Sequence, residues 1–216
     1  MTLMSPIVLI RHGEAKHMVS DLTGGWTDSH LTDLGRRQAR STAAKLKGYL
    51  RGRNCAILCS DLSRARETAE IIGGELGVKP IPHGELRELN NGIAAGLTAE
   101  QAKPHFREPT RPHLDWQGYP GAETWRTFHN RVARFMNGLE LNGDELVIIV
   151  AHGGTIITAI NWWLGLDMET IENVTYMTSP AGITVLDTSS FEERRLRRLN
   201  DASHLVNEGL LEEEIL

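Results

Sequence analysis

Long apolar runs are missing from this 216-residue sequence, and cysteines are scarce. No stretch approaches the roughly 18 apolar residues that cross a bilayer. The N-terminal residues show no basic segment followed by an apolar stretch and a cleavage site, so we expect no secretory signal. These absences predict a cytoplasmic protein without a membrane-spanning segment.

Neither sign of charge dominates the sequence. The chain has 23 Lys and Arg against 28 Asp and Glu, which gives a formal net charge of −5. This balance argues against a nucleic-acid or membrane surface spread over the molecule. The basic run at 194–198 directly follows Glu192 and Glu193, which is typical of a solvated strand edge. A binding site for an anion must therefore be formed by a few basic or polar residues that lie close together.

Cys55 and Cys59 are the only cysteines, and a strand would place both on one face. We expect reduced, buried thiols, because cytosolic cysteines rarely form disulfides. With 40% hydrophobic residues and no repeat or linker, the composition is that of a single globular domain. We assign it to residues 1–216, with a C-terminal tail from about residue 200. Coiled coils, collagen and wholesale disorder are excluded.

Short apolar runs alternate with segments of helical periodicity. The pattern predicts strands at 6–10, 56–59, 145–151, 183–186 and 194–199, and helices at 32–52, 61–76, 123–139 and 153–164. Thr32 is expected to cap the first helix, and Ser60 or Asp61 the second. Periodicity is lost between 80 and 121, which is typical of irregular connections that carry substrate contacts.

Strands that alternate with helices predict an α/β fold, with a mostly parallel sheet covered on both faces. Ligands of such sheets bind beyond the carboxyl ends of the strands. His12, Asp61 and His152 each lie just after a predicted strand. Three strands thus deliver polar side chains to one edge, where we expect the functional site.

The residues expected at this edge suit phosphoryl transfer. A neutral His12 can attack phosphorus through one ring nitrogen if a carbonyl of the Gly13 loop holds the proton on the other nitrogen. Donors for the phosphate oxygens are Arg11, Arg64, a protonated His152 and the free N–H groups of Gly153 and Gly154. Two guanidinium groups repel a divalent cation, so we expect neither a metal nor a cofactor.

The leaving alkoxide also needs a proton donor. Spacing alone leaves four carboxylates open for this role, namely Glu14, Asp61, Glu85 and Glu88.

A series of motifs in one order resembles the histidine phosphatase, or phosphoglycerate-mutase-like, superfamily. The motifs are LIRHGE at 9–14, LTDLGRRQA at 31–39, SDLSRARETA at 60–69, LRELNNG at 86–92, PGAET at 120–124 and AHGGTI at 151–156. The resemblance covers about residues 5–188. It implies a three-layer α/β/α sandwich and metal-independent hydrolysis or transfer of the phosphate of a small monoester.

The resemblance also implies a role for each matching residue. His12 corresponds to the nucleophile that becomes phosphorylated, and Glu88 to the proton donor and base. Arg11, Arg64 and His152 correspond to the phosphate pocket. These assignments agree with the chemistry expected from the residues themselves.

Departures from the family pattern favour a phosphatase. Met18 stands six positions after the nucleophile, where many relatives carry asparagine, and segment 23–26 has one glycine more than mutase relatives. Segment 92–122 lacks the clear arginine pair of mutases. A cap in this region could still bind a carboxylate or a second phosphate of the substrate, so Arg107 and Arg111 are candidate substrate contacts. The threonine and glycine of the mutase pattern add Thr23 and Gly24 as candidates. A phosphoglycerate mutase and a catalytically silent phosphate-binding module are the alternatives.

Trp162 and Trp163 are neighbours on a predicted helix and cannot share one face. We expect one in the core and the other at the surface, where it could meet a second subunit. A homodimer is therefore a candidate assembly. The expected partner is a small phosphomonoester, with no nucleic acid and no membrane.

Overall fold

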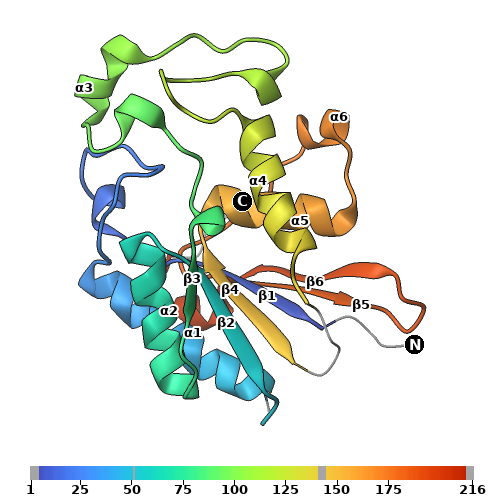
Figure 1. Ribbon diagram of the computed structural model, residues 1–216. Coiled ribbons are helices and arrows are strands. Elements are labelled where there is room, and N and C mark those ends of the chain that lie inside the picture. Colours follow the sequence, from blue (N-terminus) through green and yellow to red (C-terminus); the bar gives the residue numbers. More distant parts are fainter. Residues whose placement is uncertain (1–4, 51, 141–144, 213–216) are drawn as a thin grey trace.

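A six-stranded sheet lies at the centre of the computed structural model, which describes residues 5–50, 52–140 and 145–212. Its strand order is β3-β2-β4-β1-β5-β6 (Figure 1). The strands are β1 Ile7–Arg11, β2 Cys55–Ser60, β3 Ile81–His83, β4 Leu146–Ala151, β5 Ile183–Thr188 and β6 Arg194–Asp201. β3, β2, β4 and β1 are parallel neighbours, whereas β5 pairs antiparallel with both β1 and β6.

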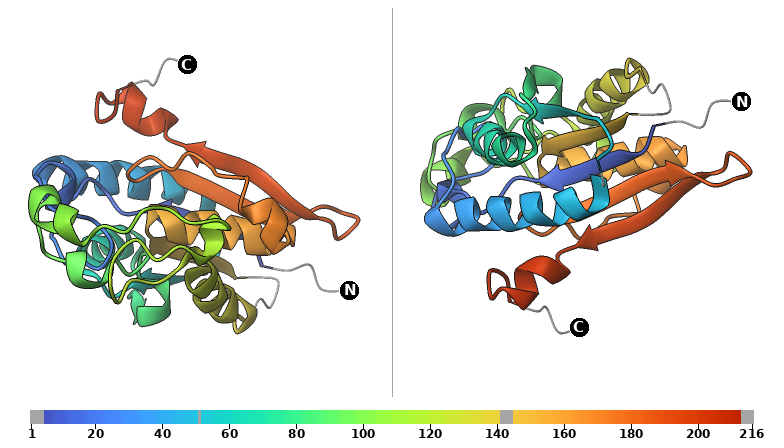
Figure 2. Two further views of the ribbon diagram at one scale, coloured as in Figure 1. Left: turned by 90° about the horizontal axis from the view of Figure 1, so that it is seen from above. Right: turned by 90° about the horizontal axis from the view of Figure 1, so that it is seen from below.

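Helices cover both faces of this sheet (Figure 2). They are α1 Asp33–Leu50, α2 Ser63–Leu76, α3 Ala99–Ala102, α4 Trp125–Asn137, α5 Gly153–Leu164, α6 Met168–Ile171 and α7 Ser203–Asn207. Side chains alternate along β1, as a pleated strand requires. Ile7 and Leu9 pack in the core with α4 and α5, and Val8 and Ile10 pack in the core with α1 and α2. The predicted three-layer α/β/α arrangement is confirmed.

One predicted helix cap is confirmed and the other is wrong. The Thr32 hydroxyl accepts a hydrogen bond from the Gly35 N–H at 3.0 Å, at the first turn of α1. Neither Ser60 nor Asp61 caps α2. The Asp28 carboxylate, from a loop far away in sequence, accepts from the backbone N–H of Ser63 at 2.8 Å and from its hydroxyl at 2.9 Å. A distant side chain therefore fixes the start of α2.

Four short elements were not predicted: β3, α3, α6 and α7. β3 contains Pro82, which a sheet tolerates at its edge because an edge strand leaves one side unpaired. Segment 92–122 is largely irregular, as predicted, and crosses the upper end of the molecule in Figure 1, beyond the carboxyl ends of the parallel strands.

The described part of the predicted tail packs on the body of the protein. Leu205 and Leu210 are buried in a small cluster with Ala181, and the Gln38 side chain of α1 donates to the Leu210 carbonyl at 2.9 Å. Residues 213–216 of the tail lie outside the described residues.

The two cysteines are free thiols on the same face of β2. Cys59 is buried, and burial raises its pKa to about 12, whereas Cys55 is only half-buried. Of the tryptophan pair, Trp163 is fully buried, and Trp162 is half-buried beneath the Arg194 guanidinium.

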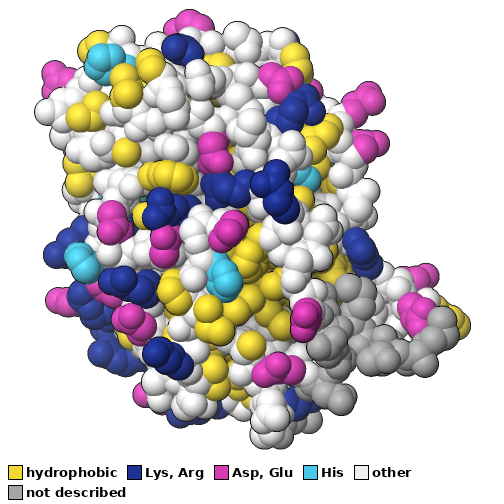
Figure 3. All heavy atoms as spheres, viewed as in Figure 1, with side chains coloured by type: hydrophobic (Ala, Val, Ile, Leu, Met, Phe, Trp, Pro, Cys, Tyr) yellow, Lys and Arg dark blue, Asp and Glu magenta, His cyan; other side chains and the backbone are white. Residues whose placement is uncertain are grey.

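Charged side chains of both signs are interspersed on the face shown in Figure 3, and hydrophobic side chains gather near its middle. Within the described ranges, no helix has the length and apolar character needed to cross a bilayer.

Candidate active site

Three strand ends bring the predicted site residues together at one edge of the sheet. His12 follows β1 and His152 follows β4, and their ring centroids are 5.1 Å apart. Arg64 enters from the first turn of α2. All three side chains are almost completely buried, at 3% exposure or less. Gly13 allows the loop after β1 to approach α1, because a Cβ there would lie 2.4 Å from the Gly35 carbonyl oxygen.

The hydrogen bonds of His12 fix its tautomer. Nδ1 lies 2.8 Å from the Gly13 carbonyl oxygen, which can only accept, so Nδ1 carries the proton. Nε2 accepts a hydrogen bond from Arg64 Nε at 3.1 Å. Burial holds the pKa of His12 well below its usual value, and the charges of Arg64 and Arg11 lower it further. The ring is therefore neutral, with the Nε2 lone pair directed into the site.

Two guanidinium groups supply the positive charge of the site. Arg64 is held by the carbonyl groups of Thr27 and Gly25, each at 2.7 Å. Burial lowers its pKa to about 10, so it stays charged at neutral pH. Arg11 donates through Nη1 to the Thr178 carbonyl. Its buried Nε has no partner among the described residues.

The surroundings of His152 disfavour the protonated ring that we expected. Burial lowers its pKa well below the usual value, and the nearby Arg64 lowers it further. Nε2 lies 2.8 Å from the Ser60 hydroxyl at the end of β2, and the buried Nδ1 has no partner within the described part of the chain. A neutral imidazole still offers one N–H to a phosphate oxygen.

Glu88 lies at the N-terminus of α5, opposite the arginines. Its carboxylate accepts from its neighbour Leu89 N–H at 2.8 Å and from the Gly154 N–H at 3.0 Å. We expected the Gly154 N–H to be free for an anionic ligand, but it already donates to Glu88. A Cβ at Gly154 would lie 2.4 Å from Glu88 Oε1, so only glycine leaves room for this carboxylate.

Two of the other candidate carboxylates have different partners. Asp61 accepts two hydrogen bonds from the Arg87 guanidinium, each at 2.7 Å. Glu14 accepts from the Thr32 hydroxyl at 2.6 Å. Glu88, by contrast, lines a cavity that contains Arg11. Burial lowers the pKa of Arg11 and of Arg64, and the charge of Glu88 opposes this lowering.

We call this cavity the active-site cavity. Its lining includes Arg11, Glu88, Trp125, Gly153, Ile157 and Thr178. Positive and negative side chains thus face one open space beyond the carboxyl ends of β1 and β4. This is the charge pattern needed to bind a phosphate dianion next to an acid.

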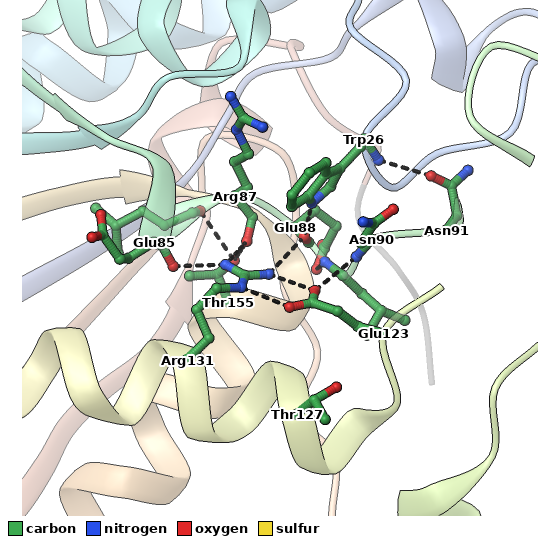
Figure 4. A network of polar contacts seen from close by, with 12 residues as sticks. Trp26, Glu85, Arg87, Glu88, Asn90, Asn91, Glu123, Thr127, Arg131 and Thr155 are labelled. Carbon is green, nitrogen blue, oxygen red and sulfur yellow. Dashed lines mark hydrogen bonds and ion pairs between the residues drawn. The ribbon is translucent and has the colours of Figure 1, made fainter. Parts of the chain in front are cut away.

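An ion pair between Arg131 of α4 and Glu123, which precedes that helix, clamps the segment 85–90, which we call the Glu88 loop (Figure 4). Arg131 donates to the carbonyl groups of Glu85 at 2.7 Å, Arg87 at 3.0 Å and Glu88 at 3.1 Å. It also donates twice to Glu123, at 2.8 and 2.7 Å. The second oxygen of Glu123 accepts from the backbone N–H of residue 90 at 2.9 Å.

Two further side chains hold the Glu88 loop from the other side (Figure 4). The Trp26 indole N–H donates to the Glu88 carbonyl at 2.7 Å. The Thr155 hydroxyl lies within hydrogen-bonding distance of the Leu86 and Arg87 carbonyl oxygens, at 3.3 and 3.2 Å. The backbone of Glu88 is thus fixed by elements that are far apart in sequence.

The four candidate substrate contacts lie elsewhere. Among the described residues that line the active-site cavity, none is Thr23, Gly24, Arg107 or Arg111. The Thr23 hydroxyl donates to the Ala94 carbonyl, and so fastens one loop to another. Of the two glycines in segment 23–26, Gly25 lines the cavity and Gly24 does not.

Arg107 and Arg111 lie in the exposed part of segment 92–122. Arg107 donates to the Gln117 side chain at 2.7 Å. Arg111 faces Glu172 at 3.9 Å. Both guanidinium groups are thus directed to other side chains.

Three residues near the histidines were not singled out from the sequence: Ser60, His17 and Thr178. Ser60 could have been found, because it stands at the end of a predicted strand, beside Asp61. The His17 ring lies 6.1 Å from that of His12, and burial lowers its pKa to about 4. No local pattern marks His17 or Thr178, because both reach the site from loops.

Comparisons with known proteins agree with this arrangement. A family model described as "Histidine phosphatase superfamily (branch 1)" matches residues 7–202. A 2,3-bisphosphoglycerate-dependent phosphoglycerate mutase of Allorhizobium ampelinum is 30% identical over 191 residues, which cover 83% of this chain and 88% of the mutase. A glucosyl-3-phosphoglycerate phosphatase of Mycolicibacterium vanbaalenii is 29% identical over 173 residues, 76% of each chain.

One solved structure is similar to this chain over most of the length of both proteins. It is the complex of a mycobacterial glucosyl-3-phosphoglycerate phosphatase with inorganic phosphate. The TM-score is 0.71 at 28% identity, and the match covers 93% of this chain and 99% of the other.

Proposed function

The chain belongs to the histidine phosphatase superfamily, as its motifs predict, and we propose that it hydrolyses small phosphomonoesters through a phosphohistidine on His12. The observation that supports this most is the state of His12. Its Nδ1–H is held by the Gly13 carbonyl, and its Nε2 lone pair points into a site with two guanidinium groups. An imidazole in this state is a nucleophile that needs no further deprotonation.

In the first half-reaction, the substrate phosphate binds between Arg11, Arg64 and His152. Arg64 Nε–H turns from His12 Nε2 to a phosphate oxygen. His12 Nε2 then attacks phosphorus, an N–P bond forms, and the P–O bond to the alcohol breaks. Protonated Glu88 gives its proton to the departing alkoxide oxygen, so a neutral alcohol leaves.

In the second half-reaction, the resulting Glu88 carboxylate takes a proton from water. The hydroxide oxygen attacks phosphorus, the N–P bond breaks and its electrons return to His12 Nε2. Inorganic phosphate leaves, and both Glu88 and His12 regain their starting states. The two arginines stabilise the charge on the transferring phosphoryl group in both steps. The proposed mechanism is metal-independent, because these groups supply the charge stabilisation.

The mutase alternative has support from several relatives that are named phosphoglycerate mutases. Transfer between positions of glycerate requires cations for a substrate carboxylate. Arg107 and Arg111, the candidates for that task, face Gln117 and Glu172 outside the active-site cavity. This placement favours hydrolysis over transfer.

The proposal includes a cytoplasmic location and leaves the homodimer as a prediction. The two free thiols of β2 suit a reducing compartment. A second subunit would have to contact Trp162 past the Arg194 side chain that covers its ring.

The test is phosphate release from a panel of phosphomonoesters in excess chelator. We expect turnover in the wild type and a loss of about 10³-fold or more in His12→Ala. His105→Ala, which removes an exposed histidine of segment 92–122, should keep full activity. Trapped wild-type enzyme should carry one acid-labile phosphate that His12→Ala lacks.

Each other outcome has a defined meaning. Activity that survives in His12→Ala, or that requires an added metal, refutes the proposed mechanism. Transfer to a phosphoglycerate acceptor without phosphate release would point to the mutase. Phosphate binding without any turnover would point to the silent module.

A further inference from the structure

A second cavity adjoins the active-site cavity, and we call it the side cavity. It has a volume of about 200 Å³. Trp125 of α4 and Ile157 of α5 line both cavities, so the two spaces lie next to each other. The remaining walls come from the short 3-10 turn His113–Asp115, from α4 and α5, and from residues 171–175.

One stripe of helix α5 runs from the active-site cavity into the side cavity. Gly154 lines the active-site cavity, Ile157 lines both, and Asn161 lines the side cavity. These residues are three and four positions apart, so they share one face of the helix. At 1.5 Å per residue, Asn161 lies about 10 Å along the axis from Gly154. An elongated group that starts at the phosphate could therefore reach Asn161.

The side cavity combines apolar walls with buried hydrogen-bonding groups. Leu114 and Ile171 are buried in its walls, and Val174 lies at its exposed rim. His129 and Asn161 are 8% and 1% exposed. Among the described residues, neither ring nitrogen of His129 nor Oδ1 of Asn161 has a hydrogen-bond partner. Buried groups of this kind are normally satisfied, so their presence in a cavity wall points to a ligand.

The charges around the side cavity exclude an anionic ligand. None of its lining residues within the described ranges is Lys or Arg, whereas Glu172 is one of them. Arg111 faces Glu172, and Arg126 donates twice to Asp115, at 2.6 and 2.9 Å. Burial lowers the pKa of His129, which leaves a neutral ring with one donor and one acceptor.

We propose that the side cavity binds the leaving group of the substrate, and that it selects phosphomonoesters of uncharged alcohols with an apolar body and a terminal hydrogen-bonding group. His129 and Asn161 would bind that terminal group. This substrate preference rests on the phosphatase activity proposed above. It specifies which class of alcohol the substrate contains.

The test compares kcat/KM for alkyl phosphates of similar intrinsic reactivity. Ethyl phosphate has a leaving group too short for the side cavity, and 2-phenylethyl phosphate fills it. We expect a kcat/KM about 10- to 100-fold higher for 2-phenylethyl phosphate, as for hydrophobic pockets in general. A para-hydroxyl group on the ring should raise kcat/KM further, and 3-phosphoglycerate should be a poorer substrate than 2-phenylethyl phosphate.

Two substitutions assign these preferences to the side cavity. Val174→Trp fills the cavity from its rim and should bring the ratio of kcat/KM for 2-phenylethyl phosphate to kcat/KM for ethyl phosphate close to one. Ile81→Trp, at an exposed position on β3, is the matched control and should keep the wild-type ratio. His129→Phe should remove the preference for the para-hydroxyl group. It should not destabilise the fold, because it removes unpaired polar atoms from a buried site.

The outcomes separate this proposal from the phosphatase activity itself. Equal kcat/KM for ethyl and 2-phenylethyl phosphate overturns the side-cavity proposal, as does a preference that Val174→Trp leaves intact. In both cases the phosphatase activity still stands. A complete lack of hydrolysis of every monoester overturns both.

Discussion

The clamp on the Glu88 loop can be tested apart from Glu88 itself. Arg131→Ala removes five hydrogen bonds, three to loop carbonyl groups and two to Glu123. The Arg131 and Glu123 side chains are only 19% and 18% exposed, so water replaces these bonds incompletely. Hydrogen bonds to charged groups contribute about 1.5–3 kcal/mol each and are not additive, so we expect a total loss of about 2–4 kcal/mol in stability.

The effect on catalysis should depend on the leaving group. A displacement of about 1 Å costs about 100-fold in rate, and the group displaced here is the proposed acid. Ethoxide needs a proton from Glu88 to leave, whereas p-nitrophenolate is a stable anion that leaves without one. Arg131→Ala should therefore lower kcat/KM about 100-fold for ethyl phosphate, and less than about fivefold for p-nitrophenyl phosphate.

The assay measures kcat/KM for both substrates, because this constant reports the step that phosphorylates His12. Glu88→Gln serves as the reference and should show the same contrast between leaving groups. Arg134→Ala removes an exposed arginine from the same helix and should leave both constants unchanged. Glu123→Gln keeps the shape of the Arg131 partner and should give an intermediate contrast.

Three results would refute the reasoning. If Arg131→Ala lowers both constants equally, the residue stabilises the fold and has no specific influence on the acid. If Glu88→Gln shows the contrast and Arg131→Ala does not, Glu88 is the acid but holds its position without the clamp. If Glu88→Gln itself shows no contrast, the proposed role of Glu88 fails.

Three further measurements test other parts of the structure. Gly154→Ala forces a Cβ against Glu88 Oε1 and should lower kcat/KM for ethyl phosphate about 10- to 100-fold. Gly74→Ala, where a Cβ meets open space, should not lower it. After correction for the second ionisation of the substrate phosphate, at about pH 6, the pH profile of kcat/KM should show no loss of activity near pH 6.5 as pH falls, because the pKa of His12 lies well below that value; a remaining acid limb centred near pH 6.5 would contradict this. The pKa of His204 is lowered by burial to about 4, so the unfolded state binds its proton first as pH falls below about 6.5, and stability is lost in that window. Urea unfolding should show a loss of about 2 kcal/mol from this group between pH 7 and 4.5, which His204→Gln should remove.

The features that could be predicted from the sequence are those that local pattern determines. The apolar runs of β1 and β4 end at Arg11 and Ala151, and each is followed directly by a histidine. Because parallel strands end at the same edge, the meeting of His12 and His152 follows from these two boundaries. The same logic placed Arg64 near them, since α2 begins just beyond β2.

Features that depend on contacts between distant segments could not be predicted. The start of α2 is set by Asp28, 35 residues before Ser63, and no helical pattern near residue 60 carries that information. The choice of Gly25 over Gly24 as a cavity residue depends on a positive φ of 60° at Gly25, which turns its carbonyl toward Arg64. The side cavity could not be predicted from the sequence either, because residues of four separate segments line it.

The position of Glu88 determines which groups of the site remain available to bind phosphate. The N-terminus of α5 has backbone N–H groups and a dipole that favour an anion, and the sequence suggested the substrate phosphate for that place. In the structure the anion is Glu88, so in the proposed mechanism the phosphate is held chiefly by Arg11 and Arg64. Each Glu88 oxygen accepts one backbone N–H and keeps a second lone pair. A proton can therefore reside on either oxygen and be passed to the leaving group while both N–H bonds stay in place. The carboxylate can then act as acid and as base from one fixed position, which is the property that the two half-reactions demand.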